Sequence, residues 1–230
     1  MFNRIVAIIC MMLSLGQFSF DAGIDEINLG GNLFLVNRTY KLDMRYVPED
    51  LIMPNVLSTS EQVLMRKEAA LALEKLFAAA QMEQGFVLHA ISGYRSYHTQ
   101  KTIYNRKIDR VGSAKRAQKY VAPPGASEHQ LGLAMDIGTP NRAGLNEGFG
   151  ETKEGIWVNE NAHRFGFIIR YKRGWEEITG YNYEPWHIRY VGVEHAQKIY
   201  EQDIPLEEYI GNLYASKEYQ VEYTVKDISE

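Results

Sequence analysis

Strand-like and helix-like stretches alternate irregularly along this chain of 230 residues, and neither an internal repeat nor an interdomain linker interrupts them. Short apolar runs predict strands at residues 33–36, 86–91, 133–137, 166–171 and 186–191. Helical spacing predicts helices at about 96–110, 193–202 and 205–215. Ser58 and Glu61 have the spacing of a capping box and predict the start of another helix, which Gly85 ends. This irregular order favours a single α+β domain.

The first twenty residues differ from the rest. Arg4 precedes an apolar run of about a dozen residues, which is typical of a secretory signal peptide and shorter than the stretch of 18 or more that spans a membrane. No cleavage site is convincing, so an uncleaved membrane anchor stays open. Cys10 follows Ile9 rather than a small residue, which disfavours lipid attachment. We therefore expect residues 1–21 to be a signal peptide or signal anchor and the protein to be extracytoplasmic.

Cys10 is the only cysteine, and this limits the chemistry that the chain can support. One cysteine forms no internal disulfide and completes no cysteine-rich zinc site, so any metal must be held by His, Asp or Glu. The net charge of −4 argues against a nucleic-acid partner. A hydrophobic content of 45% with 23% charged residues excludes a disordered chain.

Three polar patches concentrate residues suited to catalysis, at 92–100, 127–136 and 184–190. The second and third can supply two imidazoles and one carboxylate, which are three protein ligands for a zinc ion with a fourth position left to water. Zinc lowers the pKa of its bound water to about 7, and a further carboxylate is then needed to accept the proton. Glu184, three residues before His187, is the candidate for that carboxylate.

Local geometry has to bring these residues together. On a regular strand, positions three apart face opposite sides, so Glu184 and His187 would diverge. Pro185 favours a bend that lets them converge. We expect Gly132 to have a similar effect between His129 and Asp136.

These patches resemble the LAS superfamily of zinc peptidases, specifically the VanY-type D-alanyl-D-alanine carboxypeptidases. The motifs S-G-[YF]-R-[ST]-x-x-x-Q, S-x-H-x-x-G-x-A-x-D and E-x-W-H-[IVFW]-R-[YF]-V-G all occur in this order, and the resemblance extends over roughly 33–203. It implies a single α+β domain, a LAS or hedgehog-like peptidase fold, in which helices flank a central, mainly antiparallel sheet. We expect residues 22–230 to form this domain.

Carried over position by position, the resemblance implies that Zn²⁺ is bound by His129, Asp136 and His187. It makes Glu184 the general base and acid, and it makes Arg95 the residue that stabilises the oxyanion. The substrate-binding residues that it implies are Ser127 and Gln100, which hold the C-terminal carboxylate or the adjoining peptide, and Trp186 and Tyr171, which line the cleft.

The predicted activity is removal of the C-terminal D-alanine from a peptidoglycan stem peptide. An L,D-carboxypeptidase that trims tetrapeptides with the same site stays open, because the motifs fix the chemistry and not the residue before the bond. A non-catalytic cell-wall binding module is the alternative of a different class. Antibiotic resistance and routine wall maturation are both open roles, and no protein partner is evident.

Two further sets of residues are not assigned a catalytic role. Arg189 lies on the same face of a predicted strand as His187, and support of the site and a structural salt bridge are equally open. The remaining histidines are expected to be structural or at the surface: His89, His98, His163 and His195.

Overall fold

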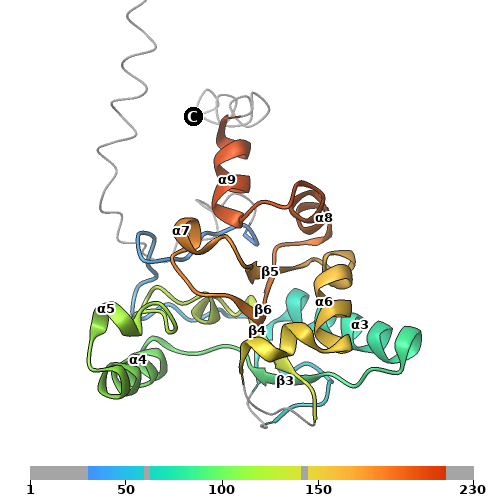
Figure 1. The fold of residues 1–230 in the computed structure, drawn as a ribbon, viewed down its shortest axis with the longest axis horizontal. Helices are drawn as coiled ribbons and strands as arrows, with labels where there is room; N and C mark the ends of the chain where they lie inside the picture. Colours follow the sequence, from blue (N-terminus) through green and yellow to red (C-terminus); the bar gives the residue numbers. More distant parts are fainter. Residues whose placement is uncertain (1–30, 60–62, 141–144, 216–230) are drawn as a thin grey trace, which may run out of the picture.

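The structure is a computed structural model that describes residues 31–59, 63–140 and 145–215. Its centre is a four-stranded sheet in the order β3-β4-β6-β5, and all neighbouring strands are antiparallel (Figure 1). The bounds of these strands are β3 (His89–Ser92), β4 (Ala134–Gly138), β5 (Phe167–Tyr171) and β6 (Glu184–Tyr190). A separate two-stranded sheet pairs β1 (Leu51–Ile52) with β2 (Met65–Arg66).

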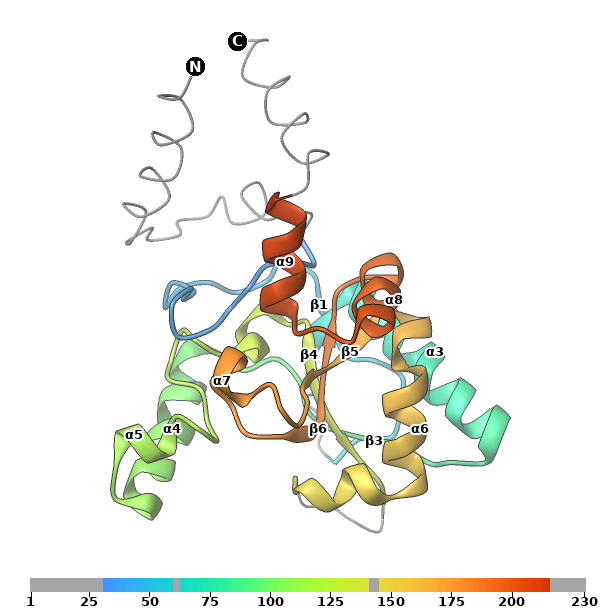
Figure 2. The same cartoon turned by 45° about the horizontal axis from the view of Figure 1, so that its top comes forward.

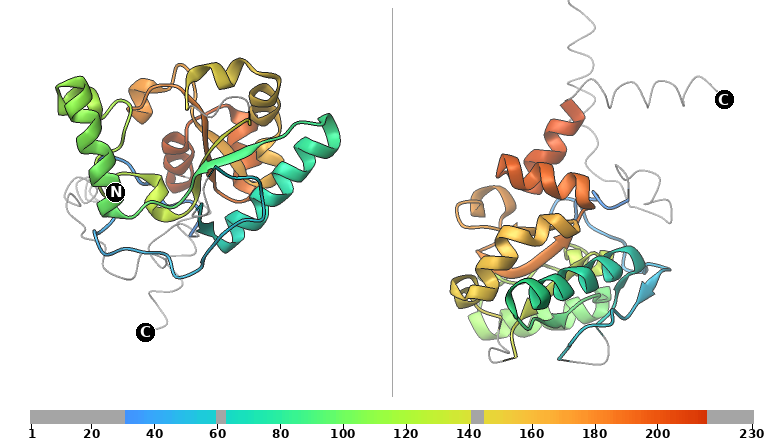
Figure 3. Two further views of the ribbon diagram at one scale, coloured as in Figure 1. Left: turned by 90° about the horizontal axis from the view of Figure 1, so that it is seen from below. Right: turned by 90° about the vertical axis from the view of Figure 1, so that its right-hand side faces the viewer.

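Helices and short 3-10 turns surround the sheet. The α-helices are α3 (Lys67–Gln84), α4 (Tyr97–Val111), α5 (Ala114–Ala117), α6 (Lys153–Asn161), α7 (Glu176–Thr179), α8 (Val193–Gln202) and α9 (Leu206–Ala215). The 3-10 turns are η1 (Glu128–Leu131), η2 (Glu147–Glu151) and η3 (Ala162–Phe165). Helices α3 and α6 lie on one side of the sheet, whereas α4 and α5 lie on the opposite side (Figures 1 and 3).

The two faces of the sheet have different chemistry because strand side chains alternate. One face carries apolar side chains that join those of α3 and α6 in the main core, among them Met135, Ile137, Ile169 and Ile188. The alternate positions on the other face carry buried polar side chains, namely Asp136, Arg170, His187 and Arg189. The sheet therefore has an apolar face for stability and a polar face that is available for chemistry.

A second, smaller core holds the C-terminal helices. Leu206, Tyr209 and Ile210 of α9 pack against Leu33 and Ile168, together with residues of α8. Figure 2 shows the segment that starts at residue 31 lying next to α9. The N-terminal segment and the C-terminal helix thus pack together beside the polar face of the sheet.

The predicted single α+β domain with a mainly antiparallel sheet is confirmed. The predicted strands 86–91, 133–137, 166–171 and 186–191 correspond to β3, β4, β5 and β6, and the three predicted helices correspond to α4, α8 and α9. The strand predicted at 33–36 is wrong, since these residues pair with no strand. The carbonyls of Asn32 and Phe34 accept hydrogen bonds from the Arg189 side chain instead.

The predicted start of the first long helix is also wrong. Helix α3 begins at Lys67, because Met65 and Arg66 are extended and pair with β1. Ser58 forms an isolated bridge with Ala90, and Glu61 lies outside the described residues. The end of the helix at Gly85 is confirmed, with Gly85 in the left-handed conformation.

The segment 1–21 lies outside the described residues, so its prediction as a signal peptide or anchor stays a prediction. Within the described parts of the chain, no helix has the length and apolar character needed to cross a membrane.

Candidate active site and metal centre

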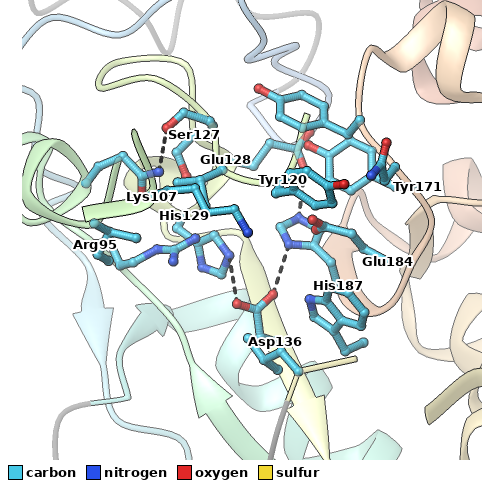
Figure 4. Close-up of a pocket in the computed structure, with 18 of the residues that line it drawn as sticks. Arg95, Lys107, Tyr120, Ser127, Glu128, His129, Asp136, Tyr171, Glu184 and His187 are labelled. Carbon is cyan, nitrogen blue, oxygen red and sulfur yellow. Dashed lines mark hydrogen bonds and ion pairs between the residues drawn. The ribbon is translucent and has the colours of Figure 1, made fainter. Parts of the chain in front are cut away.

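A cavity of about 310 Å³ opens on the polar face of the sheet, and Figure 4 shows the side chains that line it. All nine residues predicted for the site line this one cavity: Arg95, Gln100, Ser127, His129, Asp136, Tyr171, Glu184, Trp186 and His187. They come from β4, β5, β6, the 3-10 turn η1, helix α4 and the turns beside them. The structure therefore brings together residues that lie up to 92 positions apart in the sequence.

His129 presents one ring nitrogen to the cavity. It lies in η1 and is buried, and its Nδ1 lies 2.7 Å from the carbonyl oxygen of Gly93. Because a carbonyl can only accept, Nδ1 carries the hydrogen and Nε2 keeps its lone pair. Among the described residues, Nε2 of His129 has no hydrogen-bond partner.

Asp136 lies between the two imidazoles, as Figure 4 shows. Its Oδ2 is 3.3 Å from Nε2 of His129, and its Oδ1 is 3.0 Å from Nδ1 of His187. The strands fix the second contact, since Asp136 of β4 and His187 of β6 are direct partners in the antiparallel register. Gly132 turns the chain between η1 and β4 with a φ of +71°, a conformation that glycine adopts without strain.

The two imidazoles differ in charge. Burial lowers the pKa of His129 to about 4, so this ring is neutral near pH 7. Burial alone would also lower the pKa of His187, but hydrogen bonds to Asp136 and Glu128 outweigh it and raise the pKa to about 9. Burial opposes ionisation of Asp136, yet the adjacent His129 and His187 hold its pKa far below the usual range. The carboxylate is therefore ionised and ready to bind a cation.

These three side chains fit a zinc ion. One ligand atom from each of His129, Asp136 and His187 lies within 4.8 Å of the other two, and all three residues are buried. Two ligands of one tetrahedral zinc ion lie about 3.4 Å apart, which is close to the observed contacts around Asp136. Two nitrogens and one carboxylate oxygen form the donor set of hydrolytic zinc sites. Nε2 of His129, which makes no hydrogen bond among the described residues, would be a ligand of such an ion.

Glu184 opens strand β6 next to this cluster. The register between β5 and β6 shifts between the pairs Ile169–Ile188 and Tyr171–Glu184, so β6 has extra residues at this point. The bulge contains Pro185, and both Glu184 and His187 line the cavity, as the predicted bend requires. Burial raises the pKa of the Glu184 carboxyl to about 8. A carboxyl that titrates near neutral pH is suited to exchange a proton with a substrate.

Arg95 lies beside His129 in Figure 4, and Gln100 also lines the cavity. Burial lowers the pKa of Arg95, while the charges of Asp136 and Glu184 act in the opposite direction, and a guanidinium remains charged at neutral pH. Its buried Nε has no hydrogen-bond partner among the described residues. Gln100 donates from Nε2 to the carbonyl of Ala122 at 2.7 Å, which leaves its buried Oε1 without a partner. Both side chains therefore retain polar atoms that can bind a substrate.

The remaining predicted residues form the walls of the cavity. Ser127 is buried directly before η1, and Trp186 packs its partly buried ring against the main core. Tyr171 lies with its ring centroid 5.0 Å from that of His187, and burial raises the pKa of its hydroxyl well above the usual value. At neutral pH this tyrosine is therefore a neutral wall of the site.

Glu128 is a residue of the site that sequence reasoning missed. Its side chain is buried, and its Oε2 lies 3.3 Å from Nε2 of His187. Burial would raise its pKa, but the charges of Arg170 and Arg189 hold it well below the usual range. Glu128 occupies the variable position between Ser127 and His129 in the motif, and a single sequence carries no signal for its partners.

Lys107 also lines the cavity and was not predicted. It follows Gln100 by seven residues on α4, a spacing that places both on one helix face and that could have identified it. Its Nζ lies 4.2 Å from the ring centroid of Tyr120. Arg189, whose role was open, forms a salt bridge with Glu128 at 2.9 Å, so it is both paired and linked to the site.

Comparison with known proteins gives a consistent result. Residues 62–193 match the family model of the VanY D-alanyl-D-alanine carboxypeptidases. YodJ of Bacillus subtilis, a protein assigned as a carboxypeptidase, is 48% identical over 193 residues, which cover 81% of this chain and 70% of YodJ.

Solved structures give the same relationship. The LD-carboxypeptidase LdcB superimposes with a TM-score of 0.73 at 48% identity, over 79% of this chain and 86% of that one. A mutant of the vancomycin-resistance D,D-pentapeptidase VanY, in complex with Zn(II), superimposes with a TM-score of 0.66 at 36% identity, over 78% and 99% of the two chains. The chain therefore belongs to the VanY family of D-alanyl-D-alanine carboxypeptidases and is a zinc-dependent carboxypeptidase with the LAS-type α+β fold.

Proposed function

We propose that this protein removes the C-terminal D-alanine from peptidoglycan stem peptides, with His129, Asp136 and His187 as the zinc ligands and Glu184 as the general base and acid. The observation that carries this proposal is the buried His–Asp–His cluster, whose ligand atoms lie within 4.8 Å of one another beside Glu184 in one cavity. Buried polar atoms are usually hydrogen-bonded, and Nε2 of His129 makes no hydrogen bond among the described residues.

When it is bound, zinc makes a nucleophile from water at neutral pH and polarises the carbonyl of the scissile bond. Glu184 takes the proton of the attacking water and then gives it to the leaving amine, which a carboxyl with a raised pKa can do in both directions. Arg95 supplies a fixed positive charge where the carbonyl oxygen becomes negative. Its unpaired Nε makes a hydrogen-bond donor available for this role.

Exopeptidase action also requires a clamp for the free carboxylate of the substrate. We propose that Ser127 supplies a hydroxyl donor to this carboxylate. The Oε1 atom of Gln100 has no partner among the described residues and fits an N–H of the adjoining peptide. Trp186 and Tyr171 then confine the terminal residue between apolar ring surfaces.

An L,D-carboxypeptidase activity on tetrapeptide stems is the second candidate, because the superimposed LdcB is an LD-carboxypeptidase. The two activities use the same metal centre and differ in the residue before the scissile bond. The test is mass spectrometry of muropeptide pentapeptide and tetrapeptide that are incubated separately with the zinc-loaded protein. We expect loss of one alanine from the pentapeptide, whereas loss from the tetrapeptide alone would establish the second candidate.

We further propose that the protein acts outside the cytoplasm, where peptidoglycan lies, and that residues 1–21 direct it there as a signal peptide or a membrane anchor. Two roles are open for this activity: resistance, through removal of the D-alanyl-D-alanine ending that glycopeptide antibiotics bind, or routine wall maturation. Deletion of the gene separates these roles: a fall in glycopeptide tolerance supports resistance, and an altered muropeptide profile without that fall supports maturation.

A further inference from the structure

A series of charged side chains, buried except for the partly exposed Glu207, links the C-terminal helix α9 to His187. Glu207 of α9 accepts two hydrogen bonds from Arg170, Nη1 to Oε2 at 2.9 Å and Nη2 to Oε1 at 2.6 Å. Nε of Arg170 donates to Oε1 of Glu128 at 2.8 Å. The other oxygen of Glu128, Oε2, lies 3.3 Å from Nε2 of His187. The series therefore runs Glu207–Arg170–Glu128–His187.

The two oxygens of Glu128 have separate partners. Oε1 accepts from Arg170 and from Nη1 of Arg189 at 2.9 Å, whereas Oε2 lies 3.3 Å from Nε2 of His187. A carboxylate held by two guanidiniums can only accept, so it takes the hydrogen on Nε2 of His187. Nδ1 of His187 is then the nitrogen left for a metal, and this atom is the one that faces Asp136. A carboxylate in this position fixes the tautomer and the ring direction of a metal-binding histidine.

Both guanidiniums also bind residues that lie outside 62–193, the segment that matches the family model. Nη2 of Arg189 donates to the carbonyls of Asn32 and Phe34, both at 2.9 Å. Arg170 is held by Glu207, which follows that segment. The N-terminal segment and α9 pack together in the second core (Figure 2), so the groups that bind the two guanidiniums belong to one packed unit.

The main effect of this network is to orient its side chains rather than to stabilise the fold. A buried ion-pair network is often no more stabilising than apolar side chains of similar volume, because burying each charge is costly. A guanidinium fork, in contrast, fixes the orientation of the carboxylates that it binds. Arg170 uses Nε on Glu128 and both terminal nitrogens on Glu207, so the two carboxylates are fixed relative to each other.

We propose that Glu128 is the positioning residue for the metal ligand His187, and that Glu207 of α9 maintains this position through Arg170. The proposal rests on the proposed function, since it takes His187 as a zinc ligand. It adds α9, which lies beyond the matched family segment, to the parts of the chain that determine zinc binding.

The test uses the full chain in five forms: the wild type, Glu128→Gln, Glu207→Gln, Glu207→Asp and the control Glu208→Gln. Glu208 is the exposed neighbour of Glu207 on α9, so its replacement removes the same charge without touching Arg170. Zinc affinity is measured by competition with a chromogenic chelator. The absorption spectrum of the Co²⁺-loaded protein reports the ligand geometry, and thermal unfolding of the metal-free protein reports folding.

We expect Glu128→Gln to weaken zinc binding by about 10- to 100-fold, the usual effect of losing a carboxylate behind a metal-binding histidine. Glu207→Gln should weaken it by about 10-fold, at the lower end of that range, and should alter the Co²⁺ spectrum. Glu207→Asp keeps the charge and should recover part of the affinity. Glu208→Gln should match the wild type in both measurements.

If Glu207→Gln only lowers the unfolding temperature, while its zinc affinity and Co²⁺ spectrum equal those of the wild type, the role is structural and the proposal is overturned. The same holds if folded Glu128→Gln binds zinc normally. If Glu128→Gln does not fold, Glu207→Gln decides. A wild-type chain that binds no zinc overturns the proposed function itself, which separates that failure from failure of this inference.

Discussion

Asp136 and His187 are direct partners across strands β4 and β6, and Oδ1 of the aspartate lies 3.0 Å from Nδ1 of the histidine. The antiparallel register therefore sets two of the three proposed zinc ligands before any metal binds. His129 completes the set from η1, after the turn at Gly132. A metal centre built on paired strands is preorganised by the same hydrogen bonds that hold the sheet together.

Zinc should stabilise the folded chain through this centre. At a free concentration of about 100 times its Kd, the ion should add about 2.7 kcal/mol to the free energy of unfolding. A chelator should abolish both the added stability and the activity. The Asp136→Asn variant should be inactive, and zinc should not stabilise it. Denaturant unfolding with and without zinc measures the effect, with the exposed Asp109→Asn on α4 as the matched control. Equal stabilisation of Asp136→Asn would place the metal elsewhere.

Zinc binding should release a proton from His187. In the metal-free chain its pKa is about 9, so the ring is protonated at pH 7, whereas a zinc ligand must offer a free lone pair. Zinc affinity should therefore rise with pH up to about 9, and below about 4 a second proton on His129 should steepen the fall. Calorimetry in buffers of different ionisation enthalpy counts the protons that are released on zinc binding. The measurement uses the Glu184→Gln variant, because the Glu184 carboxyl has a pKa of about 8 and would otherwise contribute protons. An affinity that is constant between pH 6 and pH 8 would contradict the assignment.

Arg95 should act on the transition state rather than on the metal. Arg95→Met should lower kcat by about 100- to 1,000-fold, which is the cost of losing one oxyanion donor. Zinc content should stay at the wild-type level, because Arg95 is not a ligand. Steady-state kinetics on the pentapeptide with parallel metal analysis measure both, and the exposed Arg106→Met on α4 is the control. A change confined to KM would assign Arg95 to ground-state binding.

Gly132 should matter for stability and for the metal centre together. A methyl group at its Cβ position would lie 2.9 Å from Cδ2 of Leu51, and its φ of +71° costs a non-glycine residue about 1–2 kcal/mol. Gly85 has a φ of +72° and open space around its Cβ position, so Gly85→Ala isolates the conformational cost. We expect Gly132→Ala to lose more stability than Gly85→Ala, and only Gly132→Ala to weaken zinc binding. Equal zinc affinity in the two variants would remove Gly132 from the site.

Nine of the residues that line the cavity could be predicted from the sequence, because hydrolysis needs particular residue types and the motifs contain these types in order. Alternation along a strand also placed Arg189 on the face of His187, and both residues are on the polar face of the sheet. Short local sequence patterns were therefore sufficient to predict most of the site and the four central strands.

The rest depends on partners that are distant in the sequence. Glu128 meets Arg170 and Arg189, which lie 42 and 61 positions away, and no local pattern indicates a buried carboxylate between them. The apolar run 33–36 has the composition of a strand, but the side chain of Arg189 in β6 donates hydrogen bonds to the carbonyls of Asn32 and Phe34. The register shift beside Tyr171 is a property of two paired strands and is not visible in either one alone.

The most direct measurement compares Glu184→Gln with the wild type, for zinc content and for release of D-alanine from the pentapeptide. We predict one zinc per chain in both proteins and a kcat that is about 100- to 10,000-fold lower in the variant, because the general base and acid is lost. The exposed Glu160→Gln on α6 should match the wild type. Undiminished release of D-alanine by zinc-loaded Glu184→Gln would contradict the proposed catalytic role of this residue.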